Sequence, residues 1–204
     1  MSSRSSSRSH RFWIVSFLAL LSAGCAEQPV PPEPLSAQRQ ITAADAIKSF
    51  QIVGRIAVKH DGQAFSGTLN WTHDASHDEI FLLSPLGQGV AHIVRTPSEV
   101  TLTTADEKTH RADSIEALTQ EALGWRFPSH GLEHWILGLA APESPVRRRD
   151  KDANGQLSRL YQDGWRIDYT RRQTVQGVNL PANLEILRGG DLEVRLAIDR
   201  WVLE

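Results

Sequence analysis

The chain has 204 residues, of which 40% are hydrophobic and 23% charged, a composition typical of one globular domain with a buried core. Its formal net charge is −2, and it has no basic stripe interleaved with aromatic residues, so nucleic acid is not an expected partner. A single cysteine, Cys25, excludes an internal disulfide and argues against a zinc site.

Residues 1–24 have the organisation of a secretory signal peptide. A polar segment with three arginines precedes the apolar run "FWIVSFLALLSAG", which is shorter than the roughly 20 residues of a spanning helix. The run ends in "LSAGC", which resembles a bacterial lipobox, although Ser22 stands where a leucine is usual. This resemblance implies that Cys25 becomes the first mature residue, acylated on sulfur and nitrogen. Ala26 after it implies the outer membrane as destination.

Residues 25–41 are predicted to be an acylated N-terminus followed by an extended tether. Four prolines between residues 29 and 34 disfavour helix and strand pairing. Two or more acyl chains anchor a protein stably, whereas one binds only marginally. We therefore expect a lipid-anchored domain of residues 42–204 that stands off the bilayer.

The domain is predicted to be mainly β with helices. A helix is expected at 42–50 with Thr42 as N-cap, and after it the hydrophobic period changes from helical spacing to two. Two further helices are predicted in the middle of the chain, at 113–124, where Asp113 or Ser114 caps and Gly124 closes, and at 132–139. The basic cluster 147–151 is predicted to be a solvated loop. The expected strands are 50–60, 64–73, 79–84, 89–95, 99–104, 155–162, 164–171, 182–187 and 191–203.

About ten or eleven evenly spaced strands favour an incomplete, open antiparallel β-barrel, with the helices over one opening or face. Turn dipeptides such as Asp163–Gly164 mark the hairpins. One turn is unusual: "SPLGQG", residues 84–89, carries the large apolar Leu86. Pro85 fixes one backbone angle and Gly87 frees another, so the turn can project Leu86 into solvent. The alternative is that Leu86 folds back onto the core.

The sequence gives little sign of catalysis or of a metal. His73 and His77, and likewise His130 and His134, lie four residues apart, but neither pair belongs to an H-E-x-x-H motif. We expect exposed loop and helix-end histidines. No nucleophile elbow, P-loop or dinucleotide fingerprint occurs. The chain is therefore predicted not to be an enzyme and to need no cofactor.

The tryptophans allow two interpretations. Trp13 lies in the signal peptide, and the other five are Trp71, Trp125, Trp135, Trp165 and Trp201. Core packing explains most of them. An apolar cavity lined by aromatic side chains is the other possibility, since small soluble barrels can hold a ligand.

An ordered set of segments resembles the LolB family of outer-membrane lipoprotein receptors. It comprises "GRIAV", "FSGTLNW", "LLSPLGQ", "LGWRFPSHGLEHWILGLAAP", "GWRIDY", "LPANLEI" and "RWVL", spread over the whole mature domain. The resemblance implies an incomplete barrel with helices plugging it and an apolar cavity inside. It implies that lipoproteins arrive from a LolA-like periplasmic carrier and are inserted into the outer membrane without nucleotide.

The resemblance also places a membrane-insertion loop at Pro85, Leu86 and Gly87, with acyl chains of cargo and outer-membrane lipid as partners of a monomer. Two alternatives remain at this point. A scaffolding envelope lipoprotein predicts a filled barrel with no cavity, and an envelope hydrolase predicts a polar cleft with paired titrating groups.

Overall fold

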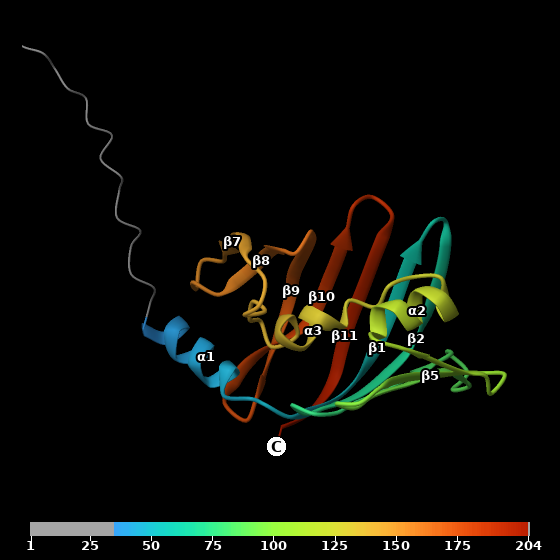
Figure 1. The fold of residues 1–204 in the computed structure, drawn as a ribbon. Helices are drawn as coiled ribbons and strands as arrows, with labels where there is room; N and C mark the ends of the chain where they lie inside the picture. The colour runs from blue at the N-terminus through green and yellow to red at the C-terminus, as the bar shows by residue number, and fades with distance from the viewer. Residues whose placement is uncertain (1–34, 204) are drawn as a thin grey trace, which may run out of the picture. The chain divides into compact units, whose positions relative to one another are not determined.

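A computed structural model describes residues 35–203, which form eleven antiparallel strands and three helices (Figure 1). The predicted acylation site, Cys25, lies outside the described residues. The elements in chain order are α1 (Leu35–Asp45), β1 (Phe50–His60), β2 (Gln63–His73), β3 (Asp78–Leu83), β4 (Gly89–Arg95), β5 (Val100–Thr104), β6 (Thr109–Ala112), α2 (Ile115–Leu123), α3 (Ser129–Trp135), β7 (Val146–Lys151), β8 (Leu157–Gln162), β9 (Trp165–Val175), β10 (Val178–Arg188) and β11 (Leu192–Leu203).

All the strands belong to one sheet in the order β6-β5-β4-β3-β2-β1-β11-β10-β9-β8-β7. Sequence neighbours therefore pair as hairpins, and the single long-range pairing joins β1 to β11. The outermost strands, β6 and β7, do not pair with each other, so the sheet is strongly curved but open. The predicted open antiparallel architecture with eleven strands is confirmed.

The inner face of the curve carries the hydrophobic core. In β1 the buried residues alternate with exposed or partly exposed ones, as expected of a strand with one covered face. The segment with α2 and α3 lies against this inner face (Figure 1). Its fully buried side chains include Leu118, Phe127, Leu132 and Ile136, which pack into the same core as the strands.

Helix α2 follows its predicted signals closely. Ser114 is extended at the N-cap, and its Oγ accepts a hydrogen bond from Ala117 N. Gly124 adopts the left-handed conformation at the C-cap, with φ of 80°.

Other boundaries differ from the predictions. Helix α1 begins at Leu35, directly after the last proline of the linker, so Thr42 is not its N-cap. Thr42 lies inside the helix, where its Oγ1 donates to Gln38 O at 3.1 Å. Helix α3 begins at Ser129 and ends at Trp135, three residues earlier than predicted at its start and four at its end.

The basic segment 147–151 was predicted to be a loop, and this prediction is wrong. It forms most of β7, which pairs with β8 on one side only. An edge strand tolerates charged side chains because one side of its backbone faces solvent. The short polar strand β6 was not predicted at all, since "THRA" carries no alternating hydrophobic pattern.

A close approach of β2 and β3 fixes the base of the turn that carries Leu86. A Cβ atom placed on Gly67 would lie 2.0 Å from the carbonyl oxygen of Leu83, the last residue of β3. Only glycine allows the two backbones to come this near at that point.

Gly67→Ala should therefore lower the free energy of unfolding by about 1–3 kcal/mol, the usual cost of forcing extra volume into a packed site. Gly190→Ala is the matched control, because a Cβ there meets nothing within 4 Å. Urea unfolding followed by tryptophan fluorescence measures both. Equal stability of the two variants would contradict the close approach.

Candidate functional site

The turn between β3 and β4, residues 84–88, is tightly built. Ser84 N donates to Gln88 O at 2.8 Å, Gly87 N donates to Ser84 O at 2.8 Å, and Gln88 N donates to Ser84 Oγ at 3.2 Å. Gly87 has a φ of 80°, a left-handed conformation that a side chain would strain. With Pro85 restricting the other side, the backbone of this turn has little freedom.

Leu86 projects from this turn into solvent with 87% of its surface exposed. The described residues contain two other exposed large apolar side chains, Ile41 at 39% and Val202 at 43%. The alternative in which Leu86 packs back onto the core is therefore wrong. The hydrogen-bonded turn thus holds an apolar side chain outward, where it is free to contact an apolar partner.

The inner face of the sheet, where the family resemblance implies a cavity, carries a cluster of buried aromatic side chains. All five tryptophans within residues 35–203 are buried. Trp71 is in edge-to-face contact with Phe50 at a centroid distance of 5.3 Å, and Trp135 lies 6.1 Å from Trp165. The tryptophans thus serve as core residues, and buried side chains of the α2–α3 segment pack into the same core.

A fully buried glutamine fastens α3 and the chain after it to the sheet. Gln162, on β8, accepts from Trp135 Nε1 and from Ala141 N at 2.9 Å each. Its amide nitrogen donates to Ala141 O at 2.7 Å and to Ser144 O at 2.6 Å. Both ends of the amide are thus satisfied, which a buried polar group requires. The sequence offered no sign of this role, because Gln162 ends an ordinary alternating strand.

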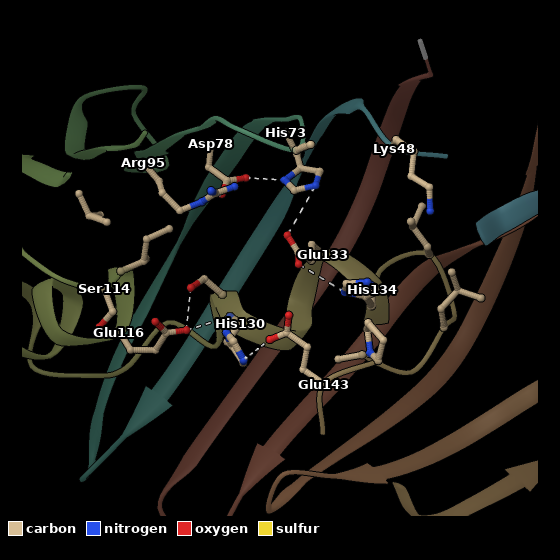
Figure 2. A pocket seen from close by; sticks show the side chains of 18 of the residues that line it. Lys48, His73, Asp78, Arg95, Ser114, Glu116, His130, Glu133, His134 and Glu143 are labelled. Carbon is tan, nitrogen blue, oxygen red and sulfur yellow. Dashed lines mark hydrogen bonds and ion pairs between the residues drawn. The ribbon is translucent and has the colours of Figure 1, made fainter. Parts of the chain in front are cut away.

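A hollow of about 480 Å³ opens between the sheet and the N-termini of α2 and α3 (Figure 2). Apolar side chains such as Val100 and Leu137 line part of it. Charged side chains line the rest and are mostly paired with one another. Figure 2 shows the principal series of side-chain contacts, which runs from Arg95 through Asp78 and His73 to Glu133.

Asp78 is the centre of this network and is only 4% exposed. It accepts hydrogen bonds from Trp71 Nε1 at 2.9 Å and from Arg95 Nε, and its Oδ1 lies 2.6 Å from His73 Nδ1. Burial by itself would raise the pKa of Asp78. The hydrogen bonds from His73, Trp71 and Arg95 outweigh burial, so the pKa lies below its ordinary value.

The other nitrogen of His73 links the network to α3. His73 Nε2 lies 3.5 Å from Glu133 Oε2, so one histidine bridges β3 and the covering helix through two carboxylates. His130 Nε2 likewise lies 3.5 Å from Glu143 Oε2. Within residues 35–203 no group of three or more histidine, cysteine or acidic side chains is placed to hold a metal.

No helix in the described part of the chain has the length and apolar content needed to cross a membrane.

The fold defines the class of protein. It resembles a LolA superfamily protein from Nitrosomonas europaea, with a TM-score of 0.52 at 13% identity over 82% of this chain and 93% of that one. It also resembles a DUF1329 family protein from Desulfovibrio piger, with a TM-score of 0.56 at 8% identity over 82% and 90% of the two chains. The chain thus shares with these two structures the fold of an open antiparallel sheet covered by helices.

Sequence comparison identifies the family. The family model described as "Outer membrane lipoprotein LolB" matches residues 48–201. An outer-membrane lipoprotein LolB from Nitrosococcus oceani is 37% identical, covering 95% of this chain and 98% of that protein. One from Pseudomonas aeruginosa strain LESB58 is 39% identical, covering 93% and 94%. The chain belongs to the LolB family of outer-membrane lipoproteins.

Asp78→Asn should lower the free energy of unfolding at pH 7 by about 1.5–3 kcal/mol, the range for hydrogen bonds to a charged group. The pKa of Asp78 is depressed on folding, so its contribution is complete above the unfolded value of about 4 and is lost as the pH falls through the lower folded value. The difference in the free energy of unfolding between the wild type and the Asp78→Asn variant should therefore become smaller in acid. Urea unfolding at pH 7 and pH 3 measures it, with the exposed Asp191→Asn as control. A gap that does not depend on pH would refute the ionised role of Asp78.

Proposed function

We propose that the chain is an outer-membrane-anchored receptor that accepts lipoproteins from a LolA-like periplasmic carrier and inserts them into the outer membrane. It acts as a monomer, without a cofactor and without enzymatic chemistry. Membership of the LolB family supports the role in lipoprotein localisation. The structural observation that carries the insertion step is Leu86, 87% exposed on a turn whose backbone is fixed.

In this proposal the protein attaches to the membrane in two ways, one permanent and one reversible. Acyl chains on Cys25 provide the permanent anchor, since two or more chains bind a bilayer stably. Burying one leucine side chain is worth roughly 1.5–3 kcal/mol, which is too little to anchor a domain. It is enough for the turn to enter the bilayer reversibly, bringing the bound cargo to the lipid surface.

Transfer without nucleotide requires a gradient of affinity. Cargo moves from carrier to receptor to membrane only if each step binds it more tightly than the one before. Side chains of α2 and α3 pack against the inner face of the sheet, so a shift of this segment would give acyl chains wider access to that face.

The packing of α2 and α3 against the inner face also suits the scaffolding alternative, in which no cargo enters the domain. Reconstitution separates the two functions. A labelled lipoprotein bound to the carrier is mixed with liposomes, with and without the reconstituted chain. The receptor accelerates transfer to the liposomes, whereas a scaffold leaves the rate unchanged.

Leu86→Ser and Leu86→Glu should leave receipt of cargo intact and reduce its insertion into liposomes, with the charged variant more severe. The reason is that the apolar contribution of roughly 1.5–3 kcal/mol is lost, and a charge resists entry into hydrocarbon. Gln88→Glu is the matched control, because it adds the same charge in the same exposed turn and keeps the leucine. The two-step transfer assay measures receipt and insertion separately.

Since Leu86 is exposed, the melting temperature of both variants should match the wild type. Undiminished insertion by the Leu86→Glu variant would show that the turn plays no part in insertion.

Cys25→Ala should release a folded domain from the membrane, because the acyl anchor and the sheet are separate units. Fractionation of cells expressing wild type and variant measures the release, and circular dichroism of the purified variant measures the fold. Mass spectrometry of the mature wild-type N-terminus provides the direct check. An unmodified thiol on Cys25 would overturn the lipid-anchor proposal.

A further inference from the structure

His73, the last residue of β2, lies between two carboxylates that belong to different elements (Figure 2). Its Nδ1 lies 2.6 Å from Oδ1 of Asp78 on β3, and its Nε2 lies 3.5 Å from Oε2 of Glu133 on α3. The side chain of His73 is only 11% exposed, and the ring of Phe50 stacks on it at a centroid distance of 4.8 Å. The imidazole is thus held with one nitrogen toward the sheet and the other toward the helix.

The hydrogen bonds of Asp78 determine which nitrogen of His73 carries a hydrogen. Trp71 Nε1 and Arg95 Nε can only donate, and both donate to Asp78. Burial opposes the ionised carboxylate, but its hydrogen bonds outweigh burial, so the pKa of Asp78 lies below its ordinary value. An ionised carboxylate only accepts, so the hydrogen bond at 2.6 Å requires a hydrogen on Nδ1 of His73. In the neutral imidazole, Nε2 is therefore an acceptor.

This tautomer places two acceptors opposite each other at the contact with α3. A neutral His73 presents the lone pair of Nε2 to the ionised carboxylate of Glu133, and no hydrogen bond forms between them. One proton on Nε2 makes the imidazole cationic and turns the same contact into a charge-assisted hydrogen bond. A proton on Glu133 would also complete the bond, so the pair needs one proton, whichever atom holds it.

The charged groups that face His73 come from several elements. Asp78 and Glu133 are negative, and Arg95 of β4, which pairs with Asp78, is positive, so one proton on His73 makes these four side chains neutral as a group. Glu133 Oε1 also lies 3.4 Å from His134 Nδ1 on the same helix. The other titratable side chains that line the hollow form no ion pair with His73 or Glu133 in the described structure: Asp45, Lys48, Asp113, Glu116, His130 and Glu143.

Two other polar contacts between the sheet and the segment with α2 and α3 form without an added proton. Gln162 of β8 uses an amide, which does not titrate near neutral pH. His110 of β6 lies 3.2 Å from Glu121 of α2, and within residues 35–203 no second carboxylate holds its other nitrogen. His110 can therefore place its hydrogen on Nδ1 and donate to Glu121 while it is neutral.

We propose that the His73–Glu133 pair is a pH switch, which fastens α3 to the sheet when the pair binds one proton and releases it when the proton leaves. Histidine is the side chain that ordinarily changes charge between about pH 5 and 8, so the switch acts near neutral pH. As the pH rises through this range, the contact through Glu133 is lost and α3 moves more readily over the hollow. The proposal does not rest on the receptor role, because the contact is present without cargo.

Hydrogen exchange tests the proposal on the full chain reconstituted in phosphatidylcholine vesicles. Mass spectrometry follows the amides of the α3 region, among them Leu132 N and Ile136 N, which donate to Pro128 O and Leu132 O. Exchange rates at pH 6 and pH 8 are divided by those of the unfolded peptides at the same pH, which removes the intrinsic effect of pH. Protection of α3 should fall about tenfold or more from pH 6 to pH 8, since a hydrogen bond to a charged group is lost. Amides of β10 and β11 should keep their protection.

Glu133→Gln should abolish the pH dependence, because the amide of glutamine donates to the neutral Nε2 without an added proton. Protection of α3 should then be high at both pH values, whereas Glu133→Ala should make it low at both. Glu121→Gln is the matched control: it makes the same change on α2, opposite His110, and should keep the wild-type pH dependence. His134→Gln should keep it as well, since the proton of the switch lies between Glu133 and His73.

Equal protection of α3 at pH 6 and pH 8 in the wild type would overturn the proposal. So would a pH dependence that persists in the Glu133→Gln variant, that is lost in the Glu121→Gln or His134→Gln variant, or that extends to β10 and β11. The measurement uses neither carrier nor cargo. A failure of the pH switch is therefore distinguishable from a failure of the receptor role, which the transfer assay measures.

Discussion

The structure depends on one constraint: a curved sheet that does not close cannot cover its own inner face. The strands present an apolar inner surface that includes Ile52 on β1 and Ile198 on β11, and within residues 35–203 no second sheet lies opposite it. Burial of apolar surface is the main favourable term in folding, so something else must cover this face. The segment with α2 and α3 does so. In the sequence it lies between β6 and β7, the strands at the two edges of the sheet.

The segment with α2 and α3 packs on the sheet through apolar side chains, and polar contacts fix its position at two places. Gln162 fastens it to β8 through four hydrogen bonds, and His73 connects it to the Asp78 network through Glu133. Apolar contacts are non-directional and permit sliding, whereas hydrogen bonds to a buried amide fix a register.

The sequence predicted the elements whose signals are local. Alternation in residues 50–60 reproduced the bounds of β1, and Ser114 and Gly124 delimited α2 as expected. The sequence did not predict the elements whose conformation depends on tertiary contacts. The charged segment 147–151 becomes a strand only because β8 offers it hydrogen-bonding partners, and no local pattern reports a partner.

In the candidate site, too, the sequence predicted the features that depend on local signals and missed those that depend on tertiary packing. The turn residues Pro85 and Gly87 indicated that Leu86 could project, because turn chemistry is local. Gln162 was not predicted, since its role depends on what tertiary packing places beside it, the indole of Trp135. Helix α1 began earlier than expected because the prolines that argued against helix all precede Leu35.

The two unpaired edges of the sheet have a consequence for crowding. Strand β7 carries three consecutive arginines, and β6 is a short polar strand of four residues. Chains anchored in one leaflet diffuse in two dimensions and meet far more often than the same number of molecules in free solution. Two β7 edges that approached each other would bring six guanidinium groups together, and like charges along facing backbones oppose pairing. The arginines of the β7 edge therefore oppose the joining of neighbouring copies into a continuous ribbon.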